Sequence, residues 1–171
     1  HLIVFDKEGM LVEICEAEKD DSQDSQGGNY TVTLTVTDKP RIIHYVANCD
    51  VNQVVYGHEI SVIGNMFVDR NGSKGAKTIH EVSYWARIEV PYIFVTKEVN
   101  NNGTVVVSLV DDIKDKFMHV PLLRNYAEIT VTDDFENKDN TFKVLGLIVY
   151  NLLNRGTVAP YNSNTQKFQS F

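Results

Sequence analysis

The chain has 171 residues, of which 43% are hydrophobic and 23% charged, a composition typical of one folded globular domain. Its formal net charge of −7 and its pI of about 5.1 argue against a nucleic-acid-binding protein, which needs a basic surface to neutralise phosphates. The sequence contains no apolar run long enough to cross a membrane. It begins with His1 and not with Met, so we expect an N-terminus that has been trimmed.

The first part of the chain predicts a β-hairpin followed by a polar loop. Residues 2–6 (LIVFD) are apolar, residues 7–9 predict a turn, and residues 10–18 (MLVEICEAE) alternate loosely between apolar and polar. Residues 19–28 (KDDSQDSQGG) contain no side chains suited to packing and predict a loop. The aspartates of this loop lack the spacing of a calcium-binding loop, so no metal site is predicted there.

Two further strands and one helix are expected next. Residues 29–38 (NYTVTLTVTD) alternate strictly, with threonines on one side, which indicates a half-buried strand. Residues 41–47 (RIIHYVA) are nearly all apolar, and this pattern favours a central strand. Apolar residues then recur with rough helical spacing, and we expect one short helix over residues 58–67.

The middle of the chain predicts a strand that carries a tryptophan, and then a second hairpin. Residues 81–90 (EVSYWARIEV) include the single tryptophan of the sequence, Trp85, which we expect in the core. Residues 93–99 and 104–110 flank the sequence Asn-Asn-Asn-Gly, and this arrangement is a strong hairpin signal. Residues 111–116 (DDIKDK) are expected to form a charged connection.

The last part of the chain completes a predicted all-β domain. Residues 120–133 (VPLLRNYAEITVTD) combine a proline-anchored entry with strict alternation, which favours an antiparallel sheet with one wet face. Residues 141–153 (TFKVLGLIVYNLL) are apolar on both faces and predict a central strand. We expect residues 1–156 to form an antiparallel β-sandwich of about seven to nine strands with at most one short helix. Residues 157–171 are expected to be a linker or the start of a following domain.

No catalytic residue, cofactor site or metal site is predicted. The five histidines lack the spacing of metal ligands, and the sequence has neither a glycine-flanked nucleophilic serine nor a Cys-x-x-Cys motif. His44 lies among apolar residues and is expected to be a hydrogen-bonded core histidine. Paired carboxylates lie in predicted loops, whereas a glycosidase dyad flanks the scissile bond from separate elements. The chain is therefore predicted not to be an enzyme.

The sequence leaves two questions open: whether the two cysteines are free or bonded to each other, and whether one residue of the aromatic pair Tyr84 and Trp85 is exposed. Cys15 and Cys49 each lie in or beside an apolar strand, where a free buried thiol is favoured, but one disulfide could form if the protein is exported. Period two places Tyr84 and Trp85 on opposite faces, so at most one of them could belong to an exposed sugar-binding platform. A carbohydrate-binding surface module without enzymatic activity is thus the alternative function.

Six segments lie in a characteristic order along nearly the whole chain: LIVFDKEGMLVE (2–13), PRIIHYVANCD (40–50), VYGHEISVI (55–63), YWARIEVP (84–91), VPLLRNYAEITV (120–131) and VYNLLNRGTVAPY (149–161). Together they resemble the N-terminal domain of the fimbrillin superfamily of Bacteroidetes, the Mfa-like and FimA-like pilus proteins. The sequence lacks the lipidated cysteine region of that family and ends where the family usually continues into a second domain. We therefore expect it to be one domain of a longer subunit.

The resemblance implies a transthyretin-like β-sandwich, export as a lipoprotein, and display on the cell surface, attached to the outer membrane or in an extracellular fimbria. It implies a structural pilus subunit or related adhesin that assembles by donor-strand exchange, in which a strand of a neighbour fills an open groove. The implied partners are other pilus subunits and host or bacterial surface ligands, with membrane contact only through a lipid anchor on the precursor. Leu2, Ile3, Val4 and Phe5 start close to the N-terminus and are expected at or next to the strand-exchange edge.

Overall fold

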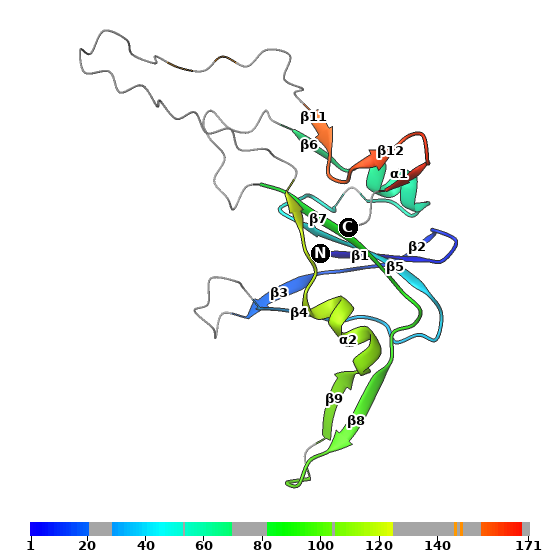
Figure 1. The fold of residues 1–171 in the computed structure, drawn as a ribbon, viewed down its shortest axis with the longest axis vertical. Coiled ribbons are helices and arrows are strands. Elements are labelled where there is room, and N and C mark those ends of the chain that lie inside the picture. Colours follow the sequence, from blue (N-terminus) through cyan, green and yellow to red (C-terminus); the bar gives the residue numbers. More distant parts are fainter. Residues whose placement is uncertain are drawn as a thin grey trace, which may run out of the picture.

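The structure is a computed structural model that describes residues 1–20, 29–52, 54–69, 82–103, 105–124, 146, 148 and 155–168. The described residues form antiparallel strands and two short helices, which confirms the predicted all-β, sandwich-like fold (Figure 1). In chain order the elements are β1 (Leu2–Asp6), β2 (Leu11–Cys15), β3 (Ala17–Asp20), β4 (Asn29–Val32), β5 (Arg41–Ala47), α1 (Glu59–Gly64), β6 (Phe67–Asp69), β7 (Tyr84–Val90), β8 (Val95–Val99), β9 (Val105–Leu109), α2 (Asp111–Met118), β10 (Leu123–Arg124), β11 (Arg155–Thr157), β12 (Tyr161–Asn162) and β13 (Lys167–Phe168).

Five strands form the main sheet, in the order β10-β7-β5-β1-β2, and every neighbouring pair is antiparallel. β5 lies between β1 and β7, as its nearly continuous apolar sequence predicts. The β1–β2 hairpin expected at the start of the chain is also confirmed. Figure 1 shows the strands of this sheet crossing the middle of the molecule.

The main sheet carries a hydrophobic cluster on each of its faces. Alternate residues of β1 divide between the clusters, because successive side chains of a strand point to opposite faces. The first core cluster also includes Val62 and Ile63 of α1 and Phe168 of β13. The second core cluster includes Ile93, and Leu109 of β9 and Phe117 of α2 pack against it. The sheet is therefore a middle layer, covered by other elements on both sides.

Trp85 and both cysteines lie where the sequence favours them. Trp85 has no exposed surface and belongs to the first core cluster, which confirms its predicted core position. Cys15 and Cys49 are both free thiols. Cys15 packs against the second core cluster and Cys49 against the first, so the sheet separates their surroundings.

Shorter strand pairs complete the described fold. β8 pairs with β9 around the Asn-Asn-Asn-Gly turn, as predicted, and this two-stranded ribbon extends away from the main sheet in Figure 1. β3 pairs with β4, β6 with β11, and β12 with β13. In the described part of the chain, no helix is long and apolar enough to span a membrane.

The structure differs from the sequence-based expectations in its helices and in one strand. The charged connection expected at residues 111–116 is helix α2, so there are two short helices and not one at most. Ile113 is the buried residue that attaches α2 to the core, while Asp111 and Asp112 occupy its first turn, where negative charge is favoured. The strand expected over residues 29–38 ends at Val32, and Thr37 then forms an isolated bridge with Ile93.

Some expected elements lie wholly or partly outside the described residues. These are the strand at residues 141–153, of which only residues 146 and 148 are described, most of the strand at residues 120–133, and the loop at residues 19–28 beyond Asp20. The predicted boundary at residue 156 stays a prediction. Beyond it, Val158, Ala159 and Phe168 are buried in the first core cluster.

The turn between β1 and β2 depends on Gly9, whose φ of +83° is strained for residues with a side chain. A Cβ atom at this position would lie 2.7 Å from Nε2 of His58. The turn is also bonded to the beginning of α1, because the amide of Glu59 donates to the Gly9 carbonyl at 2.7 Å and the amide of Leu11 donates to the Gly57 carbonyl at 3.0 Å. The turn and the helix therefore form one local unit.

We predict that Gly9→Ala lowers the free energy of unfolding by about 2 kcal/mol, through left-handed strain and through displacement of the His58 ring. The matched control is Gly103→Ala, which has a φ of +77° but open space around the new methyl group. The control should lose only about 1 kcal/mol. Chemical denaturation of both variants measures the difference, and equal losses would contradict the proposed contact with His58.

Candidate functional site

The segment expected at the strand-exchange edge, Leu2 to Phe5, forms most of β1. Its four side chains are buried, with exposed fractions between 0% and 4%. β1 pairs with β5 on one side and with β2 on the other, so it lies one strand in from the edge of the main sheet. A role of these residues in strand exchange stays a prediction, and the edge strand beside them is β2.

The β2 edge contains an irregularity at Val12. The pairing register between β1 and β2 shifts by one residue there, so Val12 is an extra residue in β2. The shift reverses the faces of the residues on its two sides: Leu11 packs against the first core cluster and Cys15 against the second. Val12 and Ile14 are 46% and 37% exposed. From Val12 onward, no described strand pairs with the outer side of β2. This edge therefore presents apolar side chains beside backbone groups that have no described strand partner.

At the opposite edge, β10 covers only the beginning of β7. Its two residues pair with Tyr84 and Trp85, and no described strand pairs with the outer side of β7 beyond that point. The ammonium group of Lys116 in α2 donates instead to the carbonyl of Glu89 at 3.1 Å. Lysine at an open sheet edge is one of the features by which proteins prevent unwanted strand pairing.

Two shallow grooves adjoin this uncovered part of β7, with volumes of about 450 and 380 Å³. They share Glu89 and Lys116 as lining residues. The first groove is also lined by Arg87, Ile88 and residues 119–121, so it follows the strand on the side that β10 leaves open. A partner strand could approach this edge only if the Lys116 side chain moved away from the Glu89 carbonyl.

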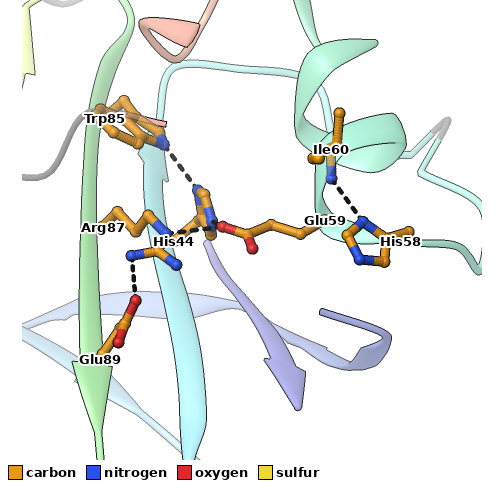
Figure 2. Close-up of polar contacts among 7 residues, drawn as sticks. All are labelled: His44, His58, Glu59, Ile60, Trp85, Arg87 and Glu89. Carbon is orange, nitrogen blue, oxygen red and sulfur yellow. Dashed lines mark hydrogen bonds and ion pairs between the residues drawn. The ribbon is translucent and has the colours of Figure 1, made fainter. Parts of the chain in front are cut away.

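A polar network, partly buried, connects α1 to β5 and β7, and Figure 2 shows its members pointing toward one another. Oε1 of Glu59 in α1 receives a hydrogen bond from Nε of Arg87 at 2.7 Å and lies 2.9 Å from Nε2 of His44. The indole N–H of Trp85 donates to Nδ1 of His44 at 2.9 Å, and Nη1 of Arg87 donates to Glu89 at 2.6 Å. The helix is thereby fixed to β5 and β7.

The contacts of His44 determine its tautomer. Because Nδ1 accepts the indole hydrogen bond, the proton is on Nε2, which donates to Glu59. The ring has no exposed surface and lies edge-on to Phe5 and Phe168, with centroids 5.5 Å from each. His44 is therefore the hydrogen-bonded core histidine that the sequence predicts.

Burial and hydrogen bonding shift the pKa values of this network in definite directions. Burial lowers the pKa of His44 below its ordinary value, and the bond to Glu59 does not offset this effect. Burial alone would raise the pKa of Glu59, but hydrogen bonds from His44 and Arg87 lower it to about 2. At neutral pH the network thus contains a neutral imidazole, a carboxylate and a guanidinium.

The network has the residue types of a catalytic relay but the geometry of a structural one. Both ring nitrogens of His44 are already bonded to protein groups, and the ring is inaccessible to a substrate. Sequence reasoning placed His44 and Trp85 in the core but did not find Glu59 or Arg87 as their partners. The network joins residues 15 to 41 positions apart in the chain, and no local pattern reports such contacts.

Comparison with known proteins identifies fimbrial relatives. Two curated sequences from Porphyromonas gingivalis, each named major fimbrium tip subunit FimE, are 26% identical to this chain over 174 residues. The match covers 98% of this chain, which spans about a quarter of the length of these relatives. No family model and no solved structure matches. The similarity supports a relationship to fimbrillin-like proteins.

We predict that Glu59→Gln destabilises the domain by about 3 kcal/mol, because it removes the buried carboxylate partner of the largely buried Arg87 guanidinium and leaves only the exposed Glu89 carboxylate. The matched control is Glu89→Gln, which also removes a carboxylate bonded to Arg87. Because the Glu89 side chain is 66% exposed, its loss should cost at most about 1 kcal/mol. Denaturant titration compares the two variants, and a larger loss for Glu89→Gln would exclude the proposed role of Glu59.

We predict that the free energy of unfolding decreases as the pH falls below 6.5. The unfolded chain then protonates His44 at its ordinary pKa of 6.5, whereas the folded protein keeps the ring neutral. Below 4.5 the unfolded chain also protonates Glu59, which in the folded protein stays ionised until the pH approaches 2. In both ranges the unfolded state binds more protons, so acid favours unfolding.

Denaturant titrations between about pH 7 and pH 3 measure this dependence, because this range extends below the ordinary pKa values of both groups. In the Glu59→Gln variant, the part of the pH dependence below 4.5 should become smaller. A wild-type stability that stays constant across the whole range would contradict the assignment of a neutral His44 and an ionised Glu59.

Proposed function

We propose that this domain is a structural, non-enzymatic part of a cell-surface fimbria. The observation that carries the proposal is the similarity to the fimbrium tip subunits, which extends over 98% of this chain. The antiparallel all-β fold fits the same role. The partners are other fimbrial subunits, and the place of action is the cell surface or an extracellular fimbria, reached through a lipid-anchored precursor.

Assembly by donor-strand exchange is the mechanism that we propose for this role. A strand of a neighbouring subunit adds to a sheet edge by main-chain hydrogen bonds, while its side chains enter apolar positions of the recipient. Two edges of the main sheet have the features that such a strand needs. The β2 edge presents Val12 and Ile14, and the β7 edge lies beside the groove lined by Ile88 and residues 119–121.

The alternative function, a carbohydrate-binding module, depended on an exposed aromatic platform around Trp85. Trp85 is completely buried and its indole N–H is already bonded to His44, so it cannot stack on a sugar. Burial of this residue favours the structural role over the alternative.

We predict that a peptide corresponding to the terminal strand of a neighbouring fimbrial subunit raises the melting temperature of the domain. A ligand that binds only the folded state stabilises it by mass action, by about 2.7 kcal/mol at a concentration one hundred times its dissociation constant. Thermal denaturation with and without peptide measures the effect, with a scrambled peptide as the control. No shift at saturating peptide would exclude strand addition.

Two variants distinguish the edges in the same assay. Ile14→Lys adds a charge to the β2 edge and should abolish the shift if the peptide binds there. Lys116→Ala frees the Glu89 carbonyl and should increase the shift if the peptide binds at β7. Immunogold labelling of bacteria that produce the protein tests the fimbrial location separately, and a label restricted to the cell interior would contradict it.

A further inference from the structure

The two grooves beside β7 carry a charge opposite in sign to that of the whole chain. Acidic residues outnumber basic ones by 23 to 16 in the sequence. Among the described residues that line the grooves, this ratio is reversed: one carboxylate, that of Glu89, lies among the cationic side chains of Lys7, Arg41, Arg87 and Lys116. The Glu89 carboxylate is itself paired with Arg87, 2.6 Å from Nη1. The grooves are therefore positive on a protein that is negative overall.

Two of these cations, Arg41 and Lys116, are bonded to uncharged groups. Nη1 of Arg41 donates to the carbonyl of Pro40 at 2.9 Å, and Nη2 donates to the hydroxyl of Thr37 at 3.3 Å. The ammonium group of Lys116 donates to the carbonyl of Glu89 at 3.1 Å. Within the described part of the chain, neither side chain forms an ion pair with a carboxylate.

Two carboxylates near these cations in the fold are bonded elsewhere. Asp112 lies one helical turn before Lys116, but it accepts a hydrogen bond from the hydroxyl of Tyr92. Asp6 lies opposite Arg41 in the β1–β5 ladder, but it accepts a hydrogen bond from a backbone amide of the β1–β2 turn at 2.8 Å. Arg41 and Lys116 therefore keep positive charges that a ligand can neutralise.

The arrangement of the grooves suits an extended ligand. Both are lined by Glu89 and Lys116, so they adjoin each other. Together they follow β7 from Arg87 to Pro91, just beyond the end of the strand. Five consecutive strand residues span about 13 Å, and an extended segment of this length lying beside β7 reaches both grooves. Ile88 gives the first groove an apolar surface for the uncharged side chains of such a segment.

The contact of Lys116 favours a polypeptide over another kind of anion. An incoming carboxylate attracts the ammonium group away from the Glu89 carbonyl, because an ion pair is stronger than a bond to a neutral acceptor. The Glu89 carbonyl then needs a new donor, and a backbone N–H of the same segment supplies it. An acidic polysaccharide supplies the charge but not amide donors at the spacing of a strand.

We propose that these two grooves bind an acidic, extended segment of a partner polypeptide, whose carboxylates pair with Arg41 and Lys116. This inference deepens the function proposed above and rests on it for the partner's identity as a fimbrial subunit. The charge of the bound segment follows from the grooves alone. For an uncharged strand Lys116 is an obstacle, whereas for an acidic segment it is a binding partner.

The test compares two peptides with blocked termini by NMR titration of the domain. Each has about ten residues, which is long enough to span both grooves. One alternates Glu with Thr, and the other has Gln in place of Glu. The Glu peptide should bind at least about tenfold more tightly at low salt, and the difference should shrink as the ionic strength rises. Because the whole protein is negative, its net charge alone would favour the uncharged peptide.

Variants of single cations locate the site. Lys116→Gln and Arg41→Gln should each weaken binding of the Glu peptide by about fivefold, as expected for one exposed ion pair. The matched control is Lys114→Gln, which removes the same charge from the same helix at an exposed position that lines neither groove. The control should change the dissociation constant by no more than about twofold. Circular dichroism and melting temperature establish that each variant is folded.

Four results would overturn the proposal. The first is equal affinity for the Glu and Gln peptides, and the second is an equal loss of affinity in Lys116→Gln and Lys114→Gln. The third is tighter binding of polygalacturonate, an acidic polysaccharide, than of the Glu peptide. The fourth is no binding of the Glu peptide at any concentration, including the case in which another part of the same chain fills the grooves.

Failure of this inference is distinguishable from failure of the proposed function. If the Glu peptide does not bind but a neighbour's terminal strand still raises the melting temperature, the fimbrial role stands and the acidic site falls. If the Glu peptide binds as expected but immunogold labelling is restricted to the cell interior, the site stands and the fimbrial role falls.

Discussion

The rest of the domain depends on β1, which is paired along both sides and buried on both faces. Ile3 and Phe5 belong to the first core cluster, and Leu2 and Val4 to the second. Alternate residues of this one five-residue strand therefore contact both covering layers. A register slip of one residue would exchange the two sets and place each side chain against the wrong layer. This requirement fixes the register of β1 against both β2 and β5.

The second constraint is the position of α1. A helix of six residues does not form by itself in water, because nucleation costs more than so few hydrogen bonds return. It is held at its beginning by the Gly9 carbonyl, along one face by Val62 and Ile63, and from the sheet by the bonds of Glu59 to His44 and Arg87. The first hairpin, the helix and strands β5 and β7 thus form one connected unit.

Sequence patterns report local structure well, and this explains which parts of the fold could be predicted. The run of apolar residues in β5, the Asn-Asn-Asn-Gly turn between β8 and β9, and the apolar surroundings of Trp85 each carry their signal within about ten residues. α2 was missed because its sequence DDIKDKFM looks like a charged loop and only Ile113 is buried. The helix is stabilised by acidic residues in its first turn and by packing on the second core cluster. Neither feature is visible as a periodic pattern in the sequence.

The candidate site was only partly accessible to the same reasoning. The sequence identified Leu2 to Phe5 as an apolar strand near the terminus, but strand order decides which strand forms an edge, and strand order depends on pairings between distant residues. β1 pairs with β5, about forty positions away, and this contact places it inside the sheet. The polar network could not be predicted from the sequence for the same reason, since Trp85 and His44 are 41 positions apart.

Both edges of the main sheet carry features that hinder the pairing of unspecific strands. Lys116 occupies the β7 edge, and the β2 edge is irregular at Val12. A strand that adds to β7 must displace a hydrogen-bonded lysine, and one that adds to β2 must accommodate a bulge, so both edges discriminate against unspecific strands.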